Sequence, residues 1–311
     1  MQLIKSGTKI DFMGKRQLAM VFSAVLIIAA VAAILVRGLH LGIDFTGGTL
    51  IEVGYETDAD IPAIRAVLEG GEFTGASVQQ FGTPRDVLIR LPQLSEEENK
   101  KVSDQVFTLL SRAADGKVEL RRVEFVGPQV GEELTEDGAL AVLVALMAIL
   151  VYVALRFEWR FALGSVIALI HDVTITVGIF ALLQIEFALP VLAAVLAVIG
   201  YSLNDTIVVY DRIRENFRKL RKGTPAEVIN TSLSQTLSRT LMTSLTTVLV
   251  LLALFFLGGE IIHGFAFALL VGVIIGTYSS IYVASTAALL LGVSKADLMP
   301  VEKEGVVDDR P

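Results

Sequence analysis

Long runs of apolar residues, each about the length of a membrane span, alternate along the chain with polar segments. The first run, Gln17–Val36, carries no charged residue and has about the 20 residues needed to cross a hydrocarbon core. Five more runs follow residue 138: Ala139–Leu155, Phe161–Leu183, Phe187–Tyr210, Leu241–Leu257 and Phe265–Leu291. The pattern predicts a polytopic α-helical membrane protein with six transmembrane helices.

The first run has an alternative interpretation as a cleaved signal peptide. Ala30-Val31-Ala32 has the small residues that precede a cleavage site. This pattern lies inside the apolar run, however, and the run is longer than the apolar core of a usual signal peptide. A retained transmembrane helix is therefore the favoured interpretation.

Residues 38–138 are polar and contain no apolar run of membrane length, so they predict a soluble domain. Strands are expected at Thr49–Tyr55, Ser77–Phe81, Val87–Leu91 and Val118–Val126, with a turn at Gly82-Thr83-Pro84. One helix is expected at Asp60–Glu69, and a second from the capping box of Ser95 and Glu98 to about Asp115-Gly116. The order βαββαβ indicates an α+β ferredoxin-like domain.

Positive charge marks one side of the membrane. Lys and Arg gather before the first run, in the loops at Arg156–Arg160 and Arg212–Lys222, and at Lys295. The positive-inside rule then puts both termini in the cytoplasm and the acidic soluble domain in the periplasm, with Arg37 snorkelling at the outer interface. The predicted segments are a cytoplasmic N-terminus (1–16), the first helix (17–37), the periplasmic domain (38–138), a five-helix region (139–292) and a cytoplasmic tail (293–311).

The amino-acid composition excludes several kinds of functional site and partner. The chain has no cysteine, which excludes disulfides, thiolate catalysis and Cys-based metal sites. It has only three histidines, so we do not expect a metal site built from histidine side chains. The net charge of −7 argues against nucleic acid as a partner. Gly47-Gly48 lacks the context of a phosphate loop, and the soluble domain has no spacing typical of a catalytic site. We therefore predict no enzymatic activity and no bound cofactor.

Ionisable groups inside the predicted helices are the main functional candidates, because each costs about 3 kcal/mol at bilayer depth. Asp205 lies beside Asn204, and Arg239 begins a polar face that continues with Thr243. A desolvated carboxyl group holds its proton more tightly, whereas a nearby guanidinium favours the charged form. A motion that separates or joins Asp205 and Arg239 would thus bind or release a proton. Alternatively, Asp205 is hydrated near the interface or held by a hydroxyl group, and Arg239 is an interfacial anchor.

Two further features of the membrane segments have open or structural interpretations. His171-Asp172 lies in the middle of one run and fits either an extension of a proton relay or a structural hydrogen-bond cluster. Ala268, Gly272, Gly276 and Ser280 recur at four-residue spacing, which is typical of close helix packing. The basic run Arg212–Lys222 is typical of an anchor to membrane lipid headgroups.

Four segments resemble the SecF family of protein-export membrane subunits. They are Gly42–Gly48, Val123–Gly131, Tyr201–Asn216 and Thr236–Thr240. The resemblance implies relation to the resistance–nodulation–division (RND) superfamily, a SecD partner with six further helices, and association with the SecYEG channel, SecA and YajC in the bacterial inner membrane. It also implies use of the proton motive force, with the proton as coupling ion, to promote late translocation and release of preproteins.

The resemblance assigns Asp205 and Arg239 to the proton pathway, since they occupy the motif positions that carry this role in the family. Two other classes of function remain as alternatives from the residues. One is half of a small-molecule or lipid exporter, and the other is a passive scaffold that stabilises a partner.

Overall fold

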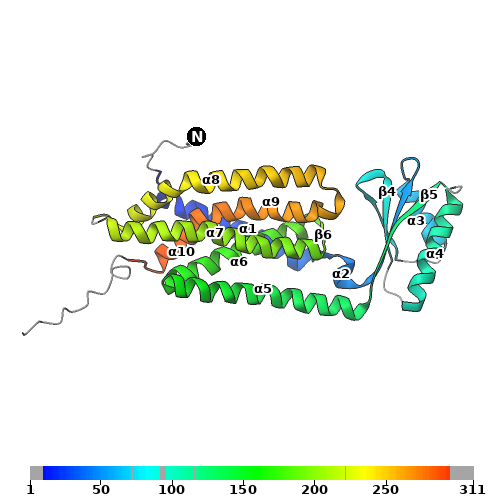
Figure 1. Ribbon diagram of the computed structural model, residues 1–311, viewed down its shortest axis with the longest axis horizontal. Coiled ribbons are helices and arrows are strands. Elements are labelled where there is room, and N and C mark those ends of the chain that lie inside the picture. The colour runs from blue at the N-terminus through cyan, green and yellow to red at the C-terminus, as the bar shows by residue number, and fades with distance from the viewer. Residues whose placement is uncertain are drawn as a thin grey trace, which may run out of the picture.

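The computed structural model describes residues 10–71, 73, 75–91, 96–114, 117–220 and 222–294. A bundle of long helices forms one end of the molecule and a small α/β domain forms the other (Figure 1). The bundle contains α1 (Arg16–Arg37), α5 (Pro128–Arg156), α6 (Trp159–Leu183), α7 (Leu189–Lys219), α8 (Pro225–Leu257) and α9 (Glu260–Ser279). The last helix continues through a π-helical turn, η2 (Ser280–Ala284), into α10 (Ser285–Leu290), and a 3₁₀ turn, η1 (Met13–Lys15), precedes α1.

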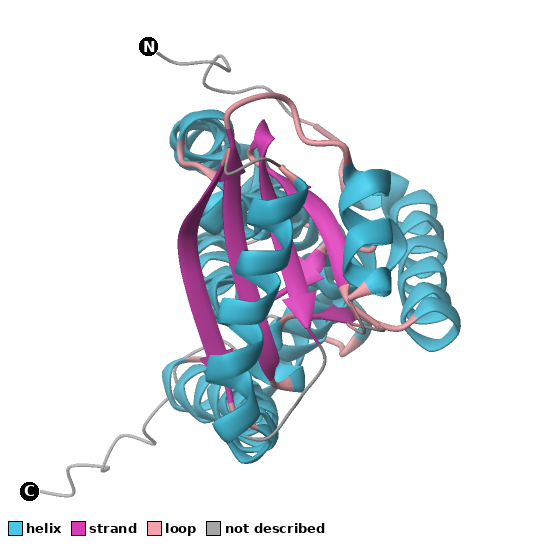
Figure 2. Cartoon of the chain, turned by 90° about the vertical axis from the view of Figure 1, so that its right-hand side faces the viewer, coloured by secondary structure: helices cyan, strands magenta, loops and turns pink. Residues whose placement is uncertain are grey.

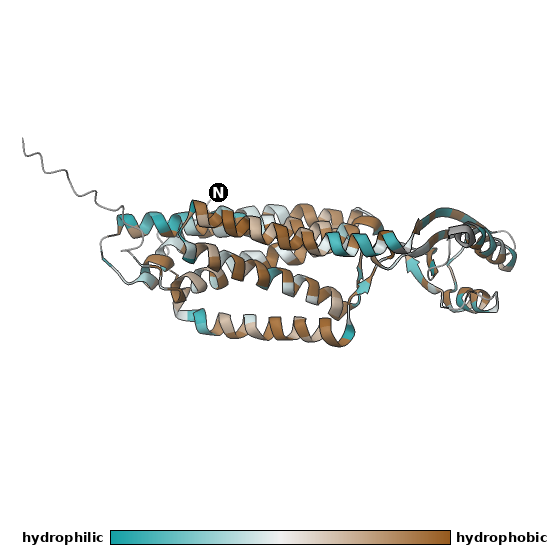
Figure 3. Cartoon of the chain, turned by 90° about the horizontal axis from the view of Figure 1, so that it is seen from below, coloured by the Kyte–Doolittle hydropathy of each residue, from teal (hydrophilic) through white to brown (hydrophobic). Residues whose placement is uncertain are grey.

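Six helices among the described residues are long and apolar enough to cross a membrane, which confirms the predicted number. Apolar residues cover most of the bundle and polar residues gather at its two ends (Figure 3). The outer helices α1, α5 and α8 expose many large apolar side chains, such as Leu35, Leu155 and Phe256. Such a surface is stable only in a hydrocarbon solvent or against another apolar surface.

Three helices extend far beyond the predicted runs. Helix α5 begins at Pro128 instead of Ala139, α7 ends at Lys219 instead of Tyr210, and α8 begins at Pro225 instead of Leu241. The apolar runs mark only the part of each helix that fits a hydrocarbon core, whereas the hydrogen bonds of a helix form equally well outside it. Polar residues therefore extend these helices past the membrane.

Small residues bring the inner helices together. A Cβ atom on Gly272 of α9 would lie 2.1 Å from Cγ2 of Val198 on α7, and one on Gly276 would lie 3.0 Å from Cβ of Ser202. On α6, a Cβ atom on Gly178 would lie 2.2 Å from Cβ of Ala30 on α1. These positions pack helix against helix without space for a side chain.

The α/β domain has the predicted order βαββαβ. It consists of β2 (Gly48–Tyr55), α3 (Ile61–Gly70), β3 (Ser77–Phe81), β4 (Thr83–Leu91), α4 (Glu96–Ala113) and β5 (Val118–Val126). The four antiparallel strands lie in the order β3-β4-β2-β5, with α3 and α4 crossing one face of the sheet (Figure 2). Strand β4 begins at Thr83 and not at Val87, so the turn is tighter than predicted. Ser95, Asp115 and Gly116, which carried helix-boundary predictions, lie outside the described residues.

The two faces of the sheet have different partners because neighbouring residues of a strand point to opposite sides. Ile51, Val53 and Ile89 pack with Leu68 of α3 and Val106 of α4 in the core of the domain. Leu50 and Leu88 point to the other face and pack with Ile43, in a smaller cluster. This second face of the sheet is the one turned toward the helical bundle (Figure 1).

A short junction, which the apolar pattern did not predict, connects the domain to the bundle. Strand β1 (His40–Leu41) pairs in parallel with β6 (Glu186–Phe187), and the one-turn helix α2 (Ile43–Thr46) follows β1. Within α2, Oδ2 of Asp44 accepts a hydrogen bond of 2.7 Å from the backbone N–H of Leu189, the first residue of α7. Asp44 thus satisfies a free N–H group at the start of a membrane helix that lies far along the chain.

Candidate functional site

Asp205 and Arg239 lie on α7 and α8, two antiparallel helices that contact each other. Each residue is roughly four helical turns from the loop that joins the two helices. The two residues are therefore at a similar depth in the bundle. The electrostatic field of Arg239 acts on the carboxyl group of Asp205.

The surroundings of Asp205 leave its carboxyl group incompletely bonded. The side chain is 4% exposed, and within the described part of the chain Oδ2 has no hydrogen-bond partner. Two nearby positions on the same helix pair, Tyr201 of α7 and Thr240 of α8, also carry a buried hydroxyl oxygen that lacks a partner among the described atoms. Polar groups in this state favour a rearrangement that supplies a proton or a partner.

Arg239 lies on the outer face of α8. Its side chain is exposed, and no salt bridge with Asp205 is found among the described residues. Thr243, one turn further along, is also exposed and its hydroxyl group donates to the carbonyl oxygens of Arg239 and Thr240. Asn204 is exposed on α7 although it precedes the buried Asp205. The structure therefore brings Asp205 and Arg239 near each other but leaves Asn204 and Thr243 on the surface of the bundle.

A second polar group, which we call the α6 cluster, lies inside the bundle around His171 and Asp172. Nδ1 of His171 lies 2.8 Å from Oδ1 of Asp172. The hydroxyl groups of Ser202 on α7 and Ser279 on α9 donate to Oδ2 of Asp172 at 2.5 and 2.7 Å. All four side chains are at most 2% exposed, so the carboxyl group of Asp172 is fully bonded without water.

The α6 cluster extends to α1 through the other nitrogen of His171. Nε2 lies 3.1 Å from Oγ of Ser23, and this oxygen lies 2.9 Å from the hydroxyl oxygen of Tyr278 on α9. The Tyr278 hydroxyl group donates to the carbonyl oxygen of Ala19 at 2.7 Å. The cluster thus connects α1, α6, α7 and α9, and sequence analysis identified only His171 and Asp172 among its members.

Sequence analysis missed the serine and tyrosine members because single hydroxyl groups are common in membrane helices and usually bond to their own backbone. Ser280 is such a case, since its hydroxyl group donates to the carbonyl oxygen of Thr277. Only the packing of α9 against α6 and α7 separates Ser279, which reaches Asp172, from its neighbour Ser280.

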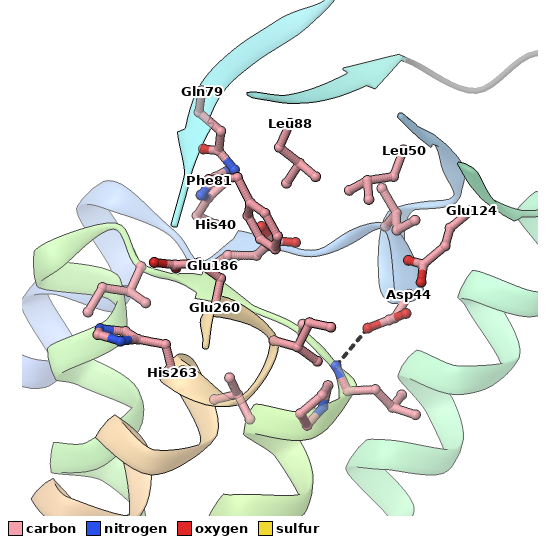
Figure 4. A pocket seen from close by; sticks show the side chains of 18 of the residues that line it. His40, Asp44, Leu50, Gln79, Phe81, Leu88, Glu124, Glu186, Glu260 and His263 are labelled. Carbon is pink, nitrogen blue, oxygen red and sulfur yellow. Dashed lines mark hydrogen bonds between the residues drawn. The ribbon is translucent and has the colours of Figure 1, made fainter. Parts of the chain in front are cut away.

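An open cleft of about 710 Å³ lies at the junction between the sheet and the ends of α6, α7 and α9 (Figure 4). Phe81 and Leu88, which are apolar side chains of the sheet, line this cleft together with four acidic groups from β5, the junction and the bundle. The acidic groups are Asp44, Glu124, Glu186 and Glu260. Nη2 of Arg90 on β4 lies 2.5 Å from Oε1 of Glu186, so an ion pair connects the sheet to the bundle beside this cleft.

Among the described residues, no group of three or more His, Asp or Glu side chains is arranged to hold a metal ion. The polar groups of the bundle are instead arranged as proton donors and acceptors, in the incompletely bonded site of Asp205 and in the closed α6 cluster.

Two regions of the chain match models of known protein families. Residues 106–294 match the model for the C-terminal part of the protein export membrane proteins SecD and SecF. Residues 32–59 match the model for the SecD/SecF GG motif. The second match includes the junction where Gly47 and Gly48 adopt positive φ angles of 67° and 128° at the start of β2.

Relatives extend over nearly the whole chain. The protein translocase subunit SecF of Vibrio alginolyticus is 53% identical over 310 residues, which cover 99% of this chain and 98% of the relative. The protein translocase subunit SecF of Pseudomonas aeruginosa is 50% identical over 309 residues, with 99% of both chains covered.

Solved structures give the same result for the fold. A crystal structure of SecDF from Thermus, described as a translocon-associated membrane protein, matches 91% of this chain with a TM-score of 0.82 and 42% identity. SecDF in a super-membrane-facing form matches 93% of this chain with a TM-score of 0.69 and the same identity. In both cases this chain spans 39% of the length of the SecDF chain.

Proposed function

The chain belongs to the SecF branch of the SecD/SecF family of protein-export membrane proteins, and from this we propose that it uses the proton motive force to promote late steps of preprotein translocation. A role in protein export as a component of the Sec machinery of the bacterial inner membrane follows from family membership. The use of a proton gradient and the release of preproteins on the periplasmic side are our proposal.

The carboxyl group of Asp205 is the single observation that carries this proposal. It is buried in the bundle with one oxygen unpartnered among the described atoms, and the field of an arginine on the facing helix acts on it without a salt bridge. In this environment the carboxyl group is stable either with a proton or with Arg239 brought against it. These two states are the elements of a proton-driven switch.

The membrane potential supplies enough free energy for such a switch. One elementary charge that crosses the membrane releases about 2.3 kcal/mol per 100 mV. This energy changes the ratio of two conformations by more than a factor of about 10. Helices α7 and α8 carry the two charged groups, and the N-terminus of α7 is bonded to Asp44 at the junction with the soluble domain. Movement of α7 is thus mechanically linked to the domain.

The exposed polar face of α8 supports a partner in the membrane. Arg239, Thr243 and Thr246 lie exposed on this helix at bilayer depth, where an unpaired charge is costly. We expect the helices of SecD to cover this face, since the solved SecDF chains are longer than this chain. SecYEG, SecA and YajC are the further partners in our proposal, with both termini in the cytoplasm and the soluble domain in the periplasm.

Completion of preprotein translocation into inverted membrane vesicles tests the proposal. The yield is measured with and without a proton gradient for the wild type, Asp205→Asn and Arg239→Met. We expect the gradient to raise the yield of the wild type and to leave both variants at the gradient-free level. Neither variant can alternate between a protonated carboxyl group and a carboxylate paired with the guanidinium group.

Asp211→Asn is the matched control. Asp211 lies on the same helix as Asp205, but it is exposed and pairs with Arg156 at 3.3 Å. We expect this variant to keep the full gradient-dependent gain. If Asp205→Asn and Arg239→Met also kept the gain, the proton switch would be wrong and a passive scaffold would be favoured.

Two further measurements separate the alternative functions. Copurification of a second six-span protein with the chain is expected if the chain is one half of a larger assembly. Gradient-driven efflux of small molecules or lipid from liposomes that contain only the purified pair, without preprotein, would instead favour an exporter.

A further inference from the structure

The α6 cluster permits a count of its hydrogen atoms, because one end of it is fixed by a backbone carbonyl group. A carbonyl oxygen can only accept, so the single hydroxyl hydrogen of Tyr278 is used toward Ala19. The contact of 2.9 Å between Ser23 and Tyr278 then requires that Ser23 donates. Ser23 has no second hydrogen, so Nε2 of His171 carries a hydrogen and donates it to Oγ of Ser23 at 3.1 Å.

At the other end of the cluster, the pair formed by His171 and Asp172 must carry a second hydrogen. Ser202 and Ser279 direct their hydroxyl hydrogens to Oδ2 of Asp172, at 2.5 and 2.7 Å, and the other acceptor of Ser279, the carbonyl oxygen of Gly276, is more distant at 3.1 Å. The contact of 2.8 Å between Nδ1 of His171 and Oδ1 of Asp172 must also contain a hydrogen, and the imidazole holds it, because an imidazole is a stronger base than a carboxylate. His171 and Asp172 together therefore carry one hydrogen more than a neutral imidazole and a carboxylate.

This extra hydrogen makes the pair electrically neutral. Without it, one negative charge would remain on Asp172, whose side chain is 0% exposed. No Lys or Arg makes an ion pair with Asp172 within the described ranges, where its charged partner is His171. A buried charge without a partner is costly in a medium of low dielectric constant, so the protonated pair is the stable form in this conformation.

The titratable groups that face the pair do not change this count. Helix α10 and the part of α1 between Arg16 and Arg37 carry no titratable side chain. On the other helices that pack against α6, the titratable side chains within the bundle are Tyr152 of α5, Tyr201, Asp205 and Tyr210 of α7, Tyr278 of α9 and Tyr282 of η2. None of these groups supplies a positive charge.

We propose that His171 and Asp172 form a second proton-holding site, which stores one exchangeable proton between Nδ1 and Oδ1 and couples it to the positions of α7 and α9. Loss of the proton would leave a buried charge that only a movement of the surrounding helices could stabilise. The hydroxyl groups that bond to Asp172 belong to those helices: Ser202 precedes Asp205 by about one turn, and Ser279 directly precedes the π-helical turn of the last span.

A role of this site in transport rests on the proposed function, but its proton count does not. The first test is therefore made on the full chain, purified with its membrane partner in lipid nanodiscs and labelled with ¹⁵N-histidine. The His171→Gln variant identifies the two ring signals of His171 by their disappearance. We expect both nitrogens of His171 to have the shifts of protonated nitrogens at neutral pH.

The Asp172→Asn variant removes the partner that shares the proton. We expect one ring nitrogen of His171 to move to the shift of a non-protonated nitrogen. A wild-type spectrum with one non-protonated nitrogen, or a spectrum unchanged in Asp172→Asn, would overturn the proposal. Should Asp172→Asn fail to accumulate, Ser23→Ala takes its place. It is expected to shift the Nε2 signal while both nitrogens stay protonated, and a non-protonated Nε2 would contradict the count.

A second test measures coupling to transport with two adjacent serines. Ser279 and Ser280 are both 0% exposed, but only Ser279 bonds to Asp172. We expect Ser279→Ala to lose most of the gradient-dependent gain in preprotein translocation and Ser280→Ala to keep it. An equal effect of the two substitutions would overturn the coupling. Retention of the gain in Asp205→Asn would count against the proposed function alone, since the histidine spectra decide the proton-holding site independently.

Discussion

Asp172 and Asp205 lie on the neighbouring helices α6 and α7, both are buried, and they differ in what surrounds their oxygen atoms. Asp172 accepts two hydroxyl hydrogens and shares a hydrogen with His171. Asp205 has an oxygen without a partner among the described atoms, and Arg239 on the facing helix forms no salt bridge with it in the described part of the chain.

The difference indicates two kinds of work for the same side chain. A fully bonded carboxyl group stabilises one arrangement of helices, because every movement breaks a hydrogen bond that no water replaces. An incompletely bonded group adds little to that arrangement and changes its protonation state or partner at a smaller cost. Asp172 therefore keeps its proton until the surrounding helices move, while Asp205 is free to respond to a proton in the packed bundle.

Alanine at each position gives the largest expected contrast. Asp172→Ala leaves the donors of Ser202 and His171 without an acceptor and leaves Ser279 only the carbonyl oxygen of Gly276, and we expect the free energy of unfolding to fall by about 3 kcal/mol. Asp205→Ala removes a buried group that already lacks a partner, so a loss below about 1 kcal/mol is expected. Reversible unfolding in lipid bicelles measures both values, and equal losses would remove the distinction drawn between the two carboxyl groups.

A substitution that changes only helix packing disturbs the site of Asp172 without altering its polar atoms, and its expected effect is smaller. A Cβ atom on Gly276 of α9 would lie 3.0 Å from Cβ of Ser202, so Gly276→Ala is expected to push Ser202 away from Asp172. Gly200 on α7 has no atom within 4 Å of a Cβ position, which makes Gly200→Ala the matched control. We expect Gly276→Ala to be less stable than Gly200→Ala by about 1 kcal/mol. The same unfolding measurement tests this, and the reverse order would show that Ser202 adjusts freely.

Asp11 lies outside the membrane helices and is a third hydrogen-bonded carboxyl group for this comparison. Because it is in contact with water, we expect a substitution near it to have the smallest effect. Hydrogen bonds from the backbone N–H of Gly14 and then from the side-chain amide of Asn230 lower the pKa of Asp11 below its ordinary value of 3.8. Because the pKa is lower in the folded protein, these bonds stabilise it above pH 3.8, and their contribution is lost as the pH falls through the lowered value.

Asn230→Ala is expected to raise the pKa of Asp11 toward 3.8 without abolishing the bond to Gly14. Titration of the ¹³C carboxyl signal of Asp11 measures this shift. Thr231→Ala is the control, since the Thr231 hydroxyl group donates to the carbonyl oxygen of Glu227 on its own helix. An unchanged midpoint in Asn230→Ala would mean that the amide contributes nothing.

The sequence predicted the elements of this molecule more completely than their contacts. Six apolar runs predicted six membrane helices, and turn residues with period-two strands predicted the order βαββαβ. The parallel pair β1 and β6 was not predicted, because each strand has only two residues and its partner lies far away in the chain. The hydrogen bond from Asp44 to the start of α7 was missed for the same reason.

For the candidate sites too, the sequence predicted the residues but not their contacts. Ionisable residues at bilayer depth are visible in sequence because they cost free energy wherever they face, so Asp205, Arg239, His171 and Asp172 were found. Whether such a residue is bonded depends on which helices surround it, and this information is not contained in the spacing along one helix. Only the structure distinguishes Ser279 from Ser280, and the closed site of Asp172 from the open site of Asp205.

The sequence by itself therefore determined the membrane character, the number of spans, the order of elements in the α/β domain and the identity of the groups that carry charge in the bundle. These properties depend on local hydrophobicity and on hydrogen bonds within an element, which a short stretch of residues specifies. The tertiary structure decided which of those groups are bonded, to which helix, and with how many protons. Such contacts join residues more than one hundred positions apart, such as Ser23 with His171 and Asp172 with Ser279, and they exist only once the helices have packed.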